Sequence, residues 1–135
     1  MAAIVLAAGQ SRRMGLNKLL LPFSQSTVIE TIVTEVRAGG VGDIVVVTGH
    51  KREWIEARLV RYPVRYVFNP DYARAEMLAS IQVGLRALAE NVAAALIVLG
   101  DQPRIQRDII RCVIEAYRPG ALIIPSFERR RGHPI

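Results

Sequence analysis

An apolar run near the amino terminus, which ends in a glycine-bounded basic loop, constrains this chain more than any other stretch. Residues Ala3–Ala8 contain no polar side chain, as expected of a strand buried on both faces of a parallel sheet. The loop that follows runs from Gly9 to Gly15. Because glycine has no Cβ, the backbone at these positions can turn tightly and approach a ligand.

Three cations, Arg12, Arg13 and Lys18, lie in or just after this loop. Peptide N–H groups in a concave turn, backed by guanidinium and ammonium groups, suit polyphosphate. The alternative is an ordinary surface loop with scattered arginines. Common nucleotide motifs fit poorly: Gly9 and Gly15 are one residue too far apart for the usual P-loop, and the GxGxxG pattern is absent, which disfavours a kinase or a dehydrogenase.

Length and composition indicate one soluble domain with a substantial core, since the chain has 135 residues of which 51% are hydrophobic. The longest apolar run, Val92–Leu99, is too short to cross a bilayer. No basic segment precedes the opening apolar run, so we expect a cytoplasmic protein without a secretory signal. Cys112, the single cysteine, is expected to be buried in a helix.

The net charge of +6 would suit a nucleic-acid-binding protein, because basic surfaces attract phosphate. However, the basic residues form small separate clusters, such as Lys51–Arg52 and Arg129–Arg131. No basic helix or ladder of basic and aromatic residues runs through the chain. The sequence therefore favours a small phosphorylated ligand and predicts neither a nucleic-acid nor a membrane partner.

Strand and helix patterns alternate along the chain. Thr27 and Glu30 have the spacing of a capping box, and apolar residues recur at helical intervals from there to Gly39. Further strands are expected at residues 43–48, 64–68, 93–99 and 121–124, and further helices at 51–60, 75–90 and 106–117. This alternation predicts a doubly wound α/β fold with a mostly parallel sheet and helices on both faces.

Helical periodicity also predicts which side chains face the sheet. In the helix at 51–60 these are Trp54, Ile55 and Leu59. In the helix at 75–90 the predicted core stripe, interrupted by Gly84, consists of Met77, Leu78, Ile81, Leu85 and Leu88. Both histidines are isolated in sequence and are expected in solvated loops.

A second polar loop, Gly100–Pro103, follows the strand expected at 93–99. Ligands collect at the carboxyl ends of parallel strands, and in doubly wound sheets the first and fourth strands commonly lie side by side. The loops Gly9–Lys18 and Gly100–Pro103 would then face one crevice. Asp101 would be either the N-cap of the next helix or a divalent-metal ligand. The neighbouring basic loop favours Mg²⁺, which proteins bind through one or two carboxylates together with substrate phosphates.

Four stretches together resemble the molybdenum cofactor nucleotidyltransferases, the MobA/MocA-like group of enzymes that transfer nucleotides onto phosphorylated acceptors. Residues 6–18 resemble the LAAGxSxRMGxxK signature of that family. Residues 69–81 are similar to its NPxx…GEMLSSI segment, residues 99–103 to its metal-binding DxP turn and residues 131–134 to its GHP turn. The resemblance covers the whole chain.

The resemblance implies a Rossmann-like nucleotidyltransferase fold and an Mg²⁺-dependent enzyme. Its reaction would move a nucleotidyl group, with CMP favoured, from an NTP to a phosphorylated acceptor such as molybdopterin, with release of pyrophosphate. CTP is favoured over GTP, because AAG in the first motif and Asp-Gln-Pro in the third are more similar to the cytidylyl branch. The alternatives are a sugar- or polyol-phosphate nucleotidyltransferase and a nucleotide-binding module without turnover.

The resemblance also implies roles for individual residues. Lys18, Arg13 and Asp101 would be catalytic, with Asp101 as the metal ligand. The base would lie near residues 6–8 and Ser80, and the triphosphate would lie on the loop backbone, Arg13 and Lys18. The full set implied to bind the nucleotide is Leu6, Ala7, Ala8, Gly9, Ser11, Arg12, Arg13, Gly15, Lys18, Asn69, Ser80 and Asp101.

Two departures from the family pattern stand out. Ala75 occupies the position of a glycine before Glu-Met, and members of the family continue past the GHP turn with further acidic metal ligands. Since this sequence stops at Ile135, we expect residues 1–135 to form a single nucleotide-binding domain that lacks the acceptor-binding C-terminal part.

Overall fold

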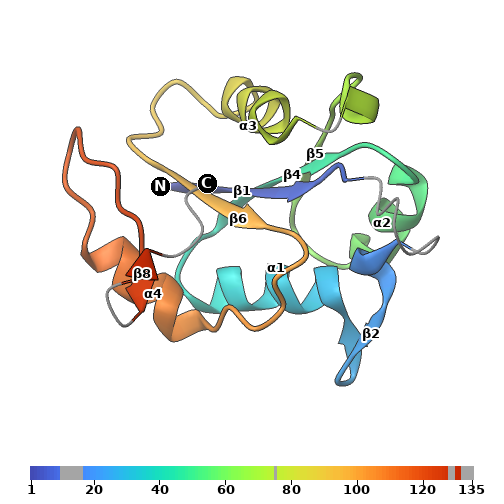
Figure 1. Ribbon diagram of the computed structural model, residues 1–135, viewed down its shortest axis with the longest axis horizontal. Helices are drawn as coiled ribbons and strands as arrows, with labels where there is room; N and C mark the ends of the chain where they lie inside the picture. Colours follow the sequence, from blue (N-terminus) through green and yellow to red (C-terminus); the bar gives the residue numbers. More distant parts are fainter. Residues whose placement is uncertain (10–16, 75, 128–129, 132–135) are drawn as a thin grey trace.

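A four-stranded parallel sheet with the strand order β5-β4-β1-β6 forms the centre of the fold (Figure 1). In this computed structural model, which describes residues 1–9, 17–74, 76–127 and 130–131, β1 (Ala2–Ala7) pairs with β4 (Asp43–Thr48) and with β6 (Ala95–Leu99). The short strand β5 (Arg65–Phe68) pairs with β4 at one edge. The predicted parallel sheet, with its first and fourth long strands side by side, is confirmed.

β1 is apolar because it is enclosed on every side. Strands flank both of its edges, and its side chains alternate between two apolar layers, as strand geometry requires. Ala3, Val5 and Ala7 belong to the larger core cluster, and Ile4 belongs to a smaller cluster on the opposite face. Because neither face of β1 is exposed to solvent, a polar side chain in this strand would be buried away from water, which costs free energy.

Helices cover both faces of the sheet, as the doubly wound prediction requires (Figure 1). α3 (Met77–Arg86) lies on one face, and α1 (Val28–Ala38) and α4 (Arg107–Glu115) lie on the other, while α2 (Arg52–Leu59) follows β4 and packs beside α1. The predicted capping box is present at the start of α1. Thr27 N donates to Glu30 Oε2 at 2.9 Å, and Glu30 N donates to Thr27 Oγ1 at 3.5 Å.

An ion pair fastens α4 to α1. Arg107 Nη2 lies 2.6 Å from Glu35 Oε1, and the backbone N–H of Arg107 also donates to this carboxylate at 2.7 Å. The side-chain hydrogen bond from Arg107, followed by the backbone one, holds the pKa of Glu35 below its usual value. α4 therefore starts at Arg107 because its first turn is bound to the neighbouring helix.

Several short elements connect these layers. The one-turn 3₁₀ helix η1 (Lys18–Leu20) leads into an antiparallel hairpin of β2 (Pro22–Phe23) and β3 (Ser26–Thr27). A second turn, η2 (Tyr72–Arg74), precedes α3, and β7 (Ser126–Phe127) pairs with β8 (Arg130–Arg131).

The fifth strand predicted at residues 121–124 is wrong. This segment forms no strand and lies opposite β6 and α4 across an apolar cavity of about 400 Å³ that all three line. Leu122 is 78% exposed there. The apolar composition of the segment suits a strand, but a strand also needs a hydrogen-bonded partner, which the described part of the chain does not supply here.

The predicted core stripe at 75–90 is correct in part: Leu88 packs against the smaller core cluster and Ile81 is half-buried, but the other three members are not buried. Met77, Leu78 and Leu85 are exposed, and the residues buried against the sheet are Ser80 and Gly84. At Gly84 the helix approaches the sheet so closely that a Cβ would collide with Ile4 Cγ2 and lie 3.1 Å from Val47 Cγ2. Small residues thus make the closest contact, and Val83 packs against the same cluster beside them.

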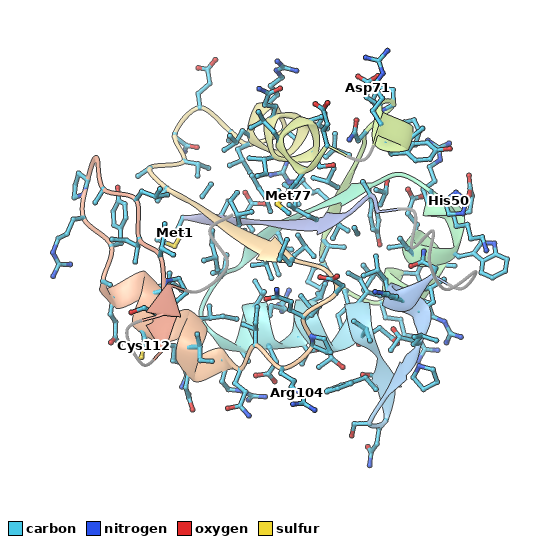
Figure 2. The ribbon with its side chains drawn as sticks, viewed as in Figure 1. Met1, His50, Asp71, Met77, Arg104 and Cys112 are labelled. Atoms are coloured by element: carbon cyan, nitrogen blue, oxygen red, sulfur yellow. The ribbon has the colours of Figure 1, made fainter. Side chains whose placement is uncertain are left out.

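Two more predictions of burial are wrong. Trp54 is 61% exposed, because α2 buries only a narrow face made by Ile55 and Leu59, which are four residues apart. Cys112 is exposed on the outer side of α4 (Figure 2), whereas Ile110 faces the core. Among the described helices, none is both long enough and apolar enough to span a membrane.

Gly84→Ala should destabilise the fold by about 1–3 kcal/mol, because overpacking against Ile4 and Val47 outweighs the higher helix propensity of alanine, about 1 kcal/mol. Urea denaturation measures the difference. Gly42→Ala is the matched control, since a Cβ there meets nothing within 4 Å; it should be neutral or slightly stabilising. Equal midpoints for wild type and Gly84→Ala would contradict the close approach of α3.

Candidate functional site

A cavity of about 280 Å³ lies at the carboxyl ends of β1 and β6, beside the start of α3. This is the edge of the sheet at which the loops after parallel strands gather. Its lining consists of Leu6, Ala8, Gly9, Lys18, Leu19, Tyr72, Glu76, Met77, Ser80, Leu99, Gly100 and Asp101.

The ends of β1 and β6 form one wall of the cavity and are joined beyond their last paired residues. Gly100 N donates to Leu6 O at 3.0 Å. A Cβ on Gly100 would collide with that same carbonyl oxygen, so the approach requires glycine. The close contact brings Asp101 to the cavity that Gly9 and Lys18 also line, as the prediction of one shared crevice requires.

Asp101 is exposed at this cavity and does not cap the next helix. α4 begins at Arg107 with Gln106 as its N-cap, so the N-cap interpretation of Asp101 is wrong. Its carboxylate makes no hydrogen bond or ion pair with the residues that the structure describes. The side chain is thus placed where a ligand in the cavity can meet it.

The opposite wall comes from η2 and the start of α3. Ser80 is buried, and its Oγ accepts a hydrogen bond from Asn69 Nδ2 at 3.0 Å. Asn69 Oδ1 in turn accepts from the backbone N–H of Asp71 at 3.0 Å. Asn69 is only 1% exposed and lies behind this wall, so it positions Ser80 and the turn rather than lining the cavity.

An aromatic cluster supports the same wall. The Tyr72 ring lies 5.9 Å from the ring of Phe68 and 6.2 Å from that of His50. His50 is half-buried beside Tyr72 at one end of the sheet (Figure 2), rather than in a fully solvated loop as predicted. Met77, the first residue of α3, lines the cavity and is exposed.

The structure brings together half of the residues that the sequence implies for nucleotide binding. Those that line the cavity are Leu6, Ala8, Gly9, Lys18, Ser80 and Asp101. Ala7 is buried in the core on the α1 side, and Asn69 lies behind Ser80. The predictions for Ser11, Arg12, Arg13 and Gly15 fall outside the described residues.

Sequence reasoning missed several lining residues, among them Leu19, Tyr72, Glu76 and Met77. Met77 was assigned to the core because its spacing fits a helical stripe. Tyr72 lies within residues 69–81, which resemble a family segment, but the resemblance implied no role for it. Glu76 directly precedes α3, which begins at the same edge of the sheet. This position could have identified it as a lining residue.

The donor set at the cavity fits a hard divalent cation in one particular way. Asp101 and Glu76 supply carboxylate oxygens to the lining. Within the described ranges, no group of three or more His, Cys, Asp or Glu side chains gathers to form a complete cage. Mg²⁺ is commonly bound by one or two carboxylates, with phosphate and water as its other ligands, and the residues present fit that mode.

Comparison with known proteins finds one matching family and several relatives of known name. The MobA-like NTP transferase domain family matches residues 3–135. The molybdenum cofactor cytidylyltransferase of Escherichia coli K12 is 31% identical over 133 residues, which cover 98% of this chain and 67% of that protein. The nicotine blue oxidoreductase of Paenarthrobacter nicotinovorans is 29% identical over 140 residues, which cover 98% and 68%.

Solved structures share the fold. A nucleotidyl transferase from Methanothermobacter thermautotroptrophicus matches with a TM-score of 0.78 and 35% identity, over 85% of this chain and 56% of that one. A Mycobacterium tuberculosis protein in complex with manganese matches with a TM-score of 0.69 and 25% identity, over 84% and 57%. The chain therefore spans about two thirds of the length of these relatives and little more than half of these solved chains.

Ser80→Ala should destabilise the protein by about 1–3 kcal/mol, because it leaves the buried Asn69 Nδ2 without its acceptor. Thermal and urea denaturation measure the loss. Gln82→Ala, an exposed position on the same helix, is the matched control and should stay within about 0.5 kcal/mol of wild type. If both variants have the same stability, the hydrogen bond does not hold this wall.

Proposed function

This chain belongs to the MobA-like NTP transferase domain family, and from this premise we propose that it binds a nucleoside triphosphate at the ends of β1 and β6 and transfers its nucleotidyl group to a phosphorylated acceptor. The observation that carries the proposal is that Gly9, Lys18 and Asp101 line one cavity. This places a cation and a carboxylate beside a turn whose backbone a ligand can approach. Phosphate and a divalent ion are the partners that suit these groups.

The residues have distinct tasks in this proposal. The base lies near Leu6, Ala8 and Ser80, and the ammonium group of Lys18 pairs with the triphosphate. Asp101 holds Mg²⁺, with Glu76 as a second carboxylate in the same lining. When bound, Mg²⁺ supplies Lewis-acid neutralisation of the phosphoryl oxygens. By the family resemblance, the backbone and side chains of Ser11, Arg12, Arg13 and Gly15 complete the phosphate site.

The chemistry requires positioning and charge rather than a proton relay. An oxygen of the acceptor's terminal phosphate attacks the α-phosphorus in line, and the bond from that phosphorus to the β-phosphate oxygen breaks, so that pyrophosphate leaves. Lys18 and Arg13 neutralise the charge that develops on the phosphoryl oxygens. Because the attacking phosphate is already anionic, no side chain is needed as a general base.

We further propose CTP as the preferred nucleotide and molybdopterin as the acceptor. The E. coli relative is named a molybdenum cofactor cytidylyltransferase, and the AAG and Asp-Gln-Pro sequences of this chain agree with that branch. A sugar phosphate or polyol phosphate is the competing acceptor, because the cavity residues described here contact the nucleotide and not the acceptor in this proposal.

Nucleotide binding should raise the thermal stability of the protein in an Mg²⁺-dependent way, by about 2.7 kcal/mol at a ligand concentration one hundred times Kd. CTP, GTP and ATP are compared with and without Mg²⁺, and the largest rise is expected for CTP. Asp101→Asn should lose the metal-dependent part and keep the melting temperature of the unliganded protein. Asp108→Asn, an exposed carboxylate on α4, is the control and should behave as wild type. A protein that no nucleotide stabilises would refute the proposal.

Turnover is tested by following pyrophosphate release from CTP in the presence of molybdopterin or a polyol phosphate. Lys18→Gln should reduce kcat/KM by about 10²-fold or more, since it removes a cation from the developing charge. Release with one acceptor and not the other identifies the acceptor class. Binding of CTP without release under any of these conditions would instead support a nucleotide-binding module.

A further inference from the structure

A further cavity, of about 630 Å³, lies between η1 and the first two turns of α2 and shares no lining residue with the nucleotide cavity. Its lining combines apolar and charged side chains. They are Asn17, Leu20, Leu21, Lys51, Glu53, Trp54, Ala57 and Arg58. Nothing in the proposed nucleotide transfer uses these residues.

Asn17 is the most informative member of this lining. It is 8% exposed, and its Oδ1 accepts a hydrogen bond from Leu19 N at 3.1 Å, which caps η1. The other half of the amide has no such role: Nδ2 is buried and finds no acceptor among the residues that the structure describes. Leaving a buried donor unpaired costs about 1–3 kcal/mol. Because Asn17 lines the cavity, a ligand oxygen that reaches Nδ2 would recover that cost.

Two cations in the same lining favour an anionic ligand. Lys51 and Arg58 both line the cavity. The one carboxylate there, Glu53, is already paired, since Arg52 Nε lies 3.3 Å from its Oε1. A hydrogen bond from its own backbone N–H, followed by the one from Arg52, keeps the pKa of Glu53 below its usual value. The cavity therefore has positive charge that its own acidic residue does not neutralise.

The start of α2 adds to this charge. Lys51 is the N-cap of the helix, has a left-handed backbone with φ 54°, and makes no side-chain hydrogen bond to the first turn. The first turn, at the positive end of the helix dipole, thus borders the cavity, and within it Trp54 N donates to Lys51 O at 3.1 Å. This helix end matters here because the unpaired Asn17 amide belongs to the same lining.

The rest of the lining suits an apolar or aromatic body. Trp54 is 61% exposed, and Lys51 Nζ lies 5.1 Å from the centre of its ring. Leu20, Leu21 and Ala57 add aliphatic surface. An exposed tryptophan beside leucines and cations forms an amphiphilic surface, which matches a ligand with one anionic end and one apolar end.

We propose that this cavity is a second small-molecule site, which binds an organic anion with a phosphate or carboxylate group on an apolar or aromatic body. An anionic oxygen accepts the hydrogen bond of Asn17 Nδ2 and pairs with Lys51 and Arg58. The body packs on Trp54 and the two leucines. The site is separate from nucleotide binding, so its test does not depend on turnover.

The chain contains a single tryptophan, Trp54, so tryptophan fluorescence reports on this cavity directly. The full protein is titrated at constant ionic strength with benzyl phosphate, benzoate, inorganic phosphate and benzyl alcohol. We expect a saturable change with benzyl phosphate or benzoate, and the tighter of these two identifies the anionic group. Inorganic phosphate and benzyl alcohol, which each lack one half of the ligand, should bind about tenfold more weakly or worse.

Three variants connect the signal to the lining. Asn17→Asp keeps the oxygen that caps η1 and replaces the unpaired donor, so it should weaken binding about tenfold or more. Arg58→Gln removes an exposed cation, with no effect expected on folding, and should weaken binding about threefold to tenfold. Arg61→Gln, an exposed arginine just after the same helix that does not line the cavity, should bind as wild type.

The proposal fails if none of the probes gives a saturable change, or if benzyl alcohol binds as well as the anions. It also fails if Arg58→Gln binds as tightly as Arg61→Gln, a comparison that holds even where Asn17→Asp does not fold. Circular dichroism establishes that each compared variant is folded.

Discussion

The enclosure of β1 is the constraint on which the rest of this structure depends. A strand that pairs on both edges and is covered on both faces must be apolar throughout, so polar chemistry starts only where the strand ends. At that end Gly100 allows the backbones of two neighbouring strands to remain close together beyond their paired residues. The cavity with Lys18 and Asp101 is a direct result of this geometry.

The fold could be predicted from the sequence where the signal was local. The bounds of β4 and the capping box of α1 follow from runs of neighbouring residues and agree with the structure. Errors arose where tertiary contacts decide. Gly84 sets the phase of α3 because a missing side chain permits close packing, which a search for large apolar residues overlooks. Trp54 is apolar in composition, yet α2 has too narrow a buried face to cover it.

The sequence predicted the residues of the candidate site that follow the strand ends, but not those on the opposite wall. Gly9, Lys18 and Asp101 were identified because the ends of parallel strands share one sheet edge. Tyr72 reaches the same cavity through a turn and an aromatic cluster, neither of which has a periodic pattern. The cavity between η1 and α2 has no sequence signal, because it and the buried, unpaired Asn17 amide form only when these two elements lie together.

The pairing of β1 with β6 also has a consequence for folding during synthesis on the ribosome. Parallel neighbours cannot be joined by a hairpin, and here the two paired segments lie at residues 2–6 and 95–99. β1 therefore leaves the ribosome long before one of its two partners has been synthesised, and the backbone N–H and C=O groups of that edge stay unpaired until then. Contacts of such long sequence separation form slowly. The strand that organises the finished fold is thus the one that most needs protection during synthesis.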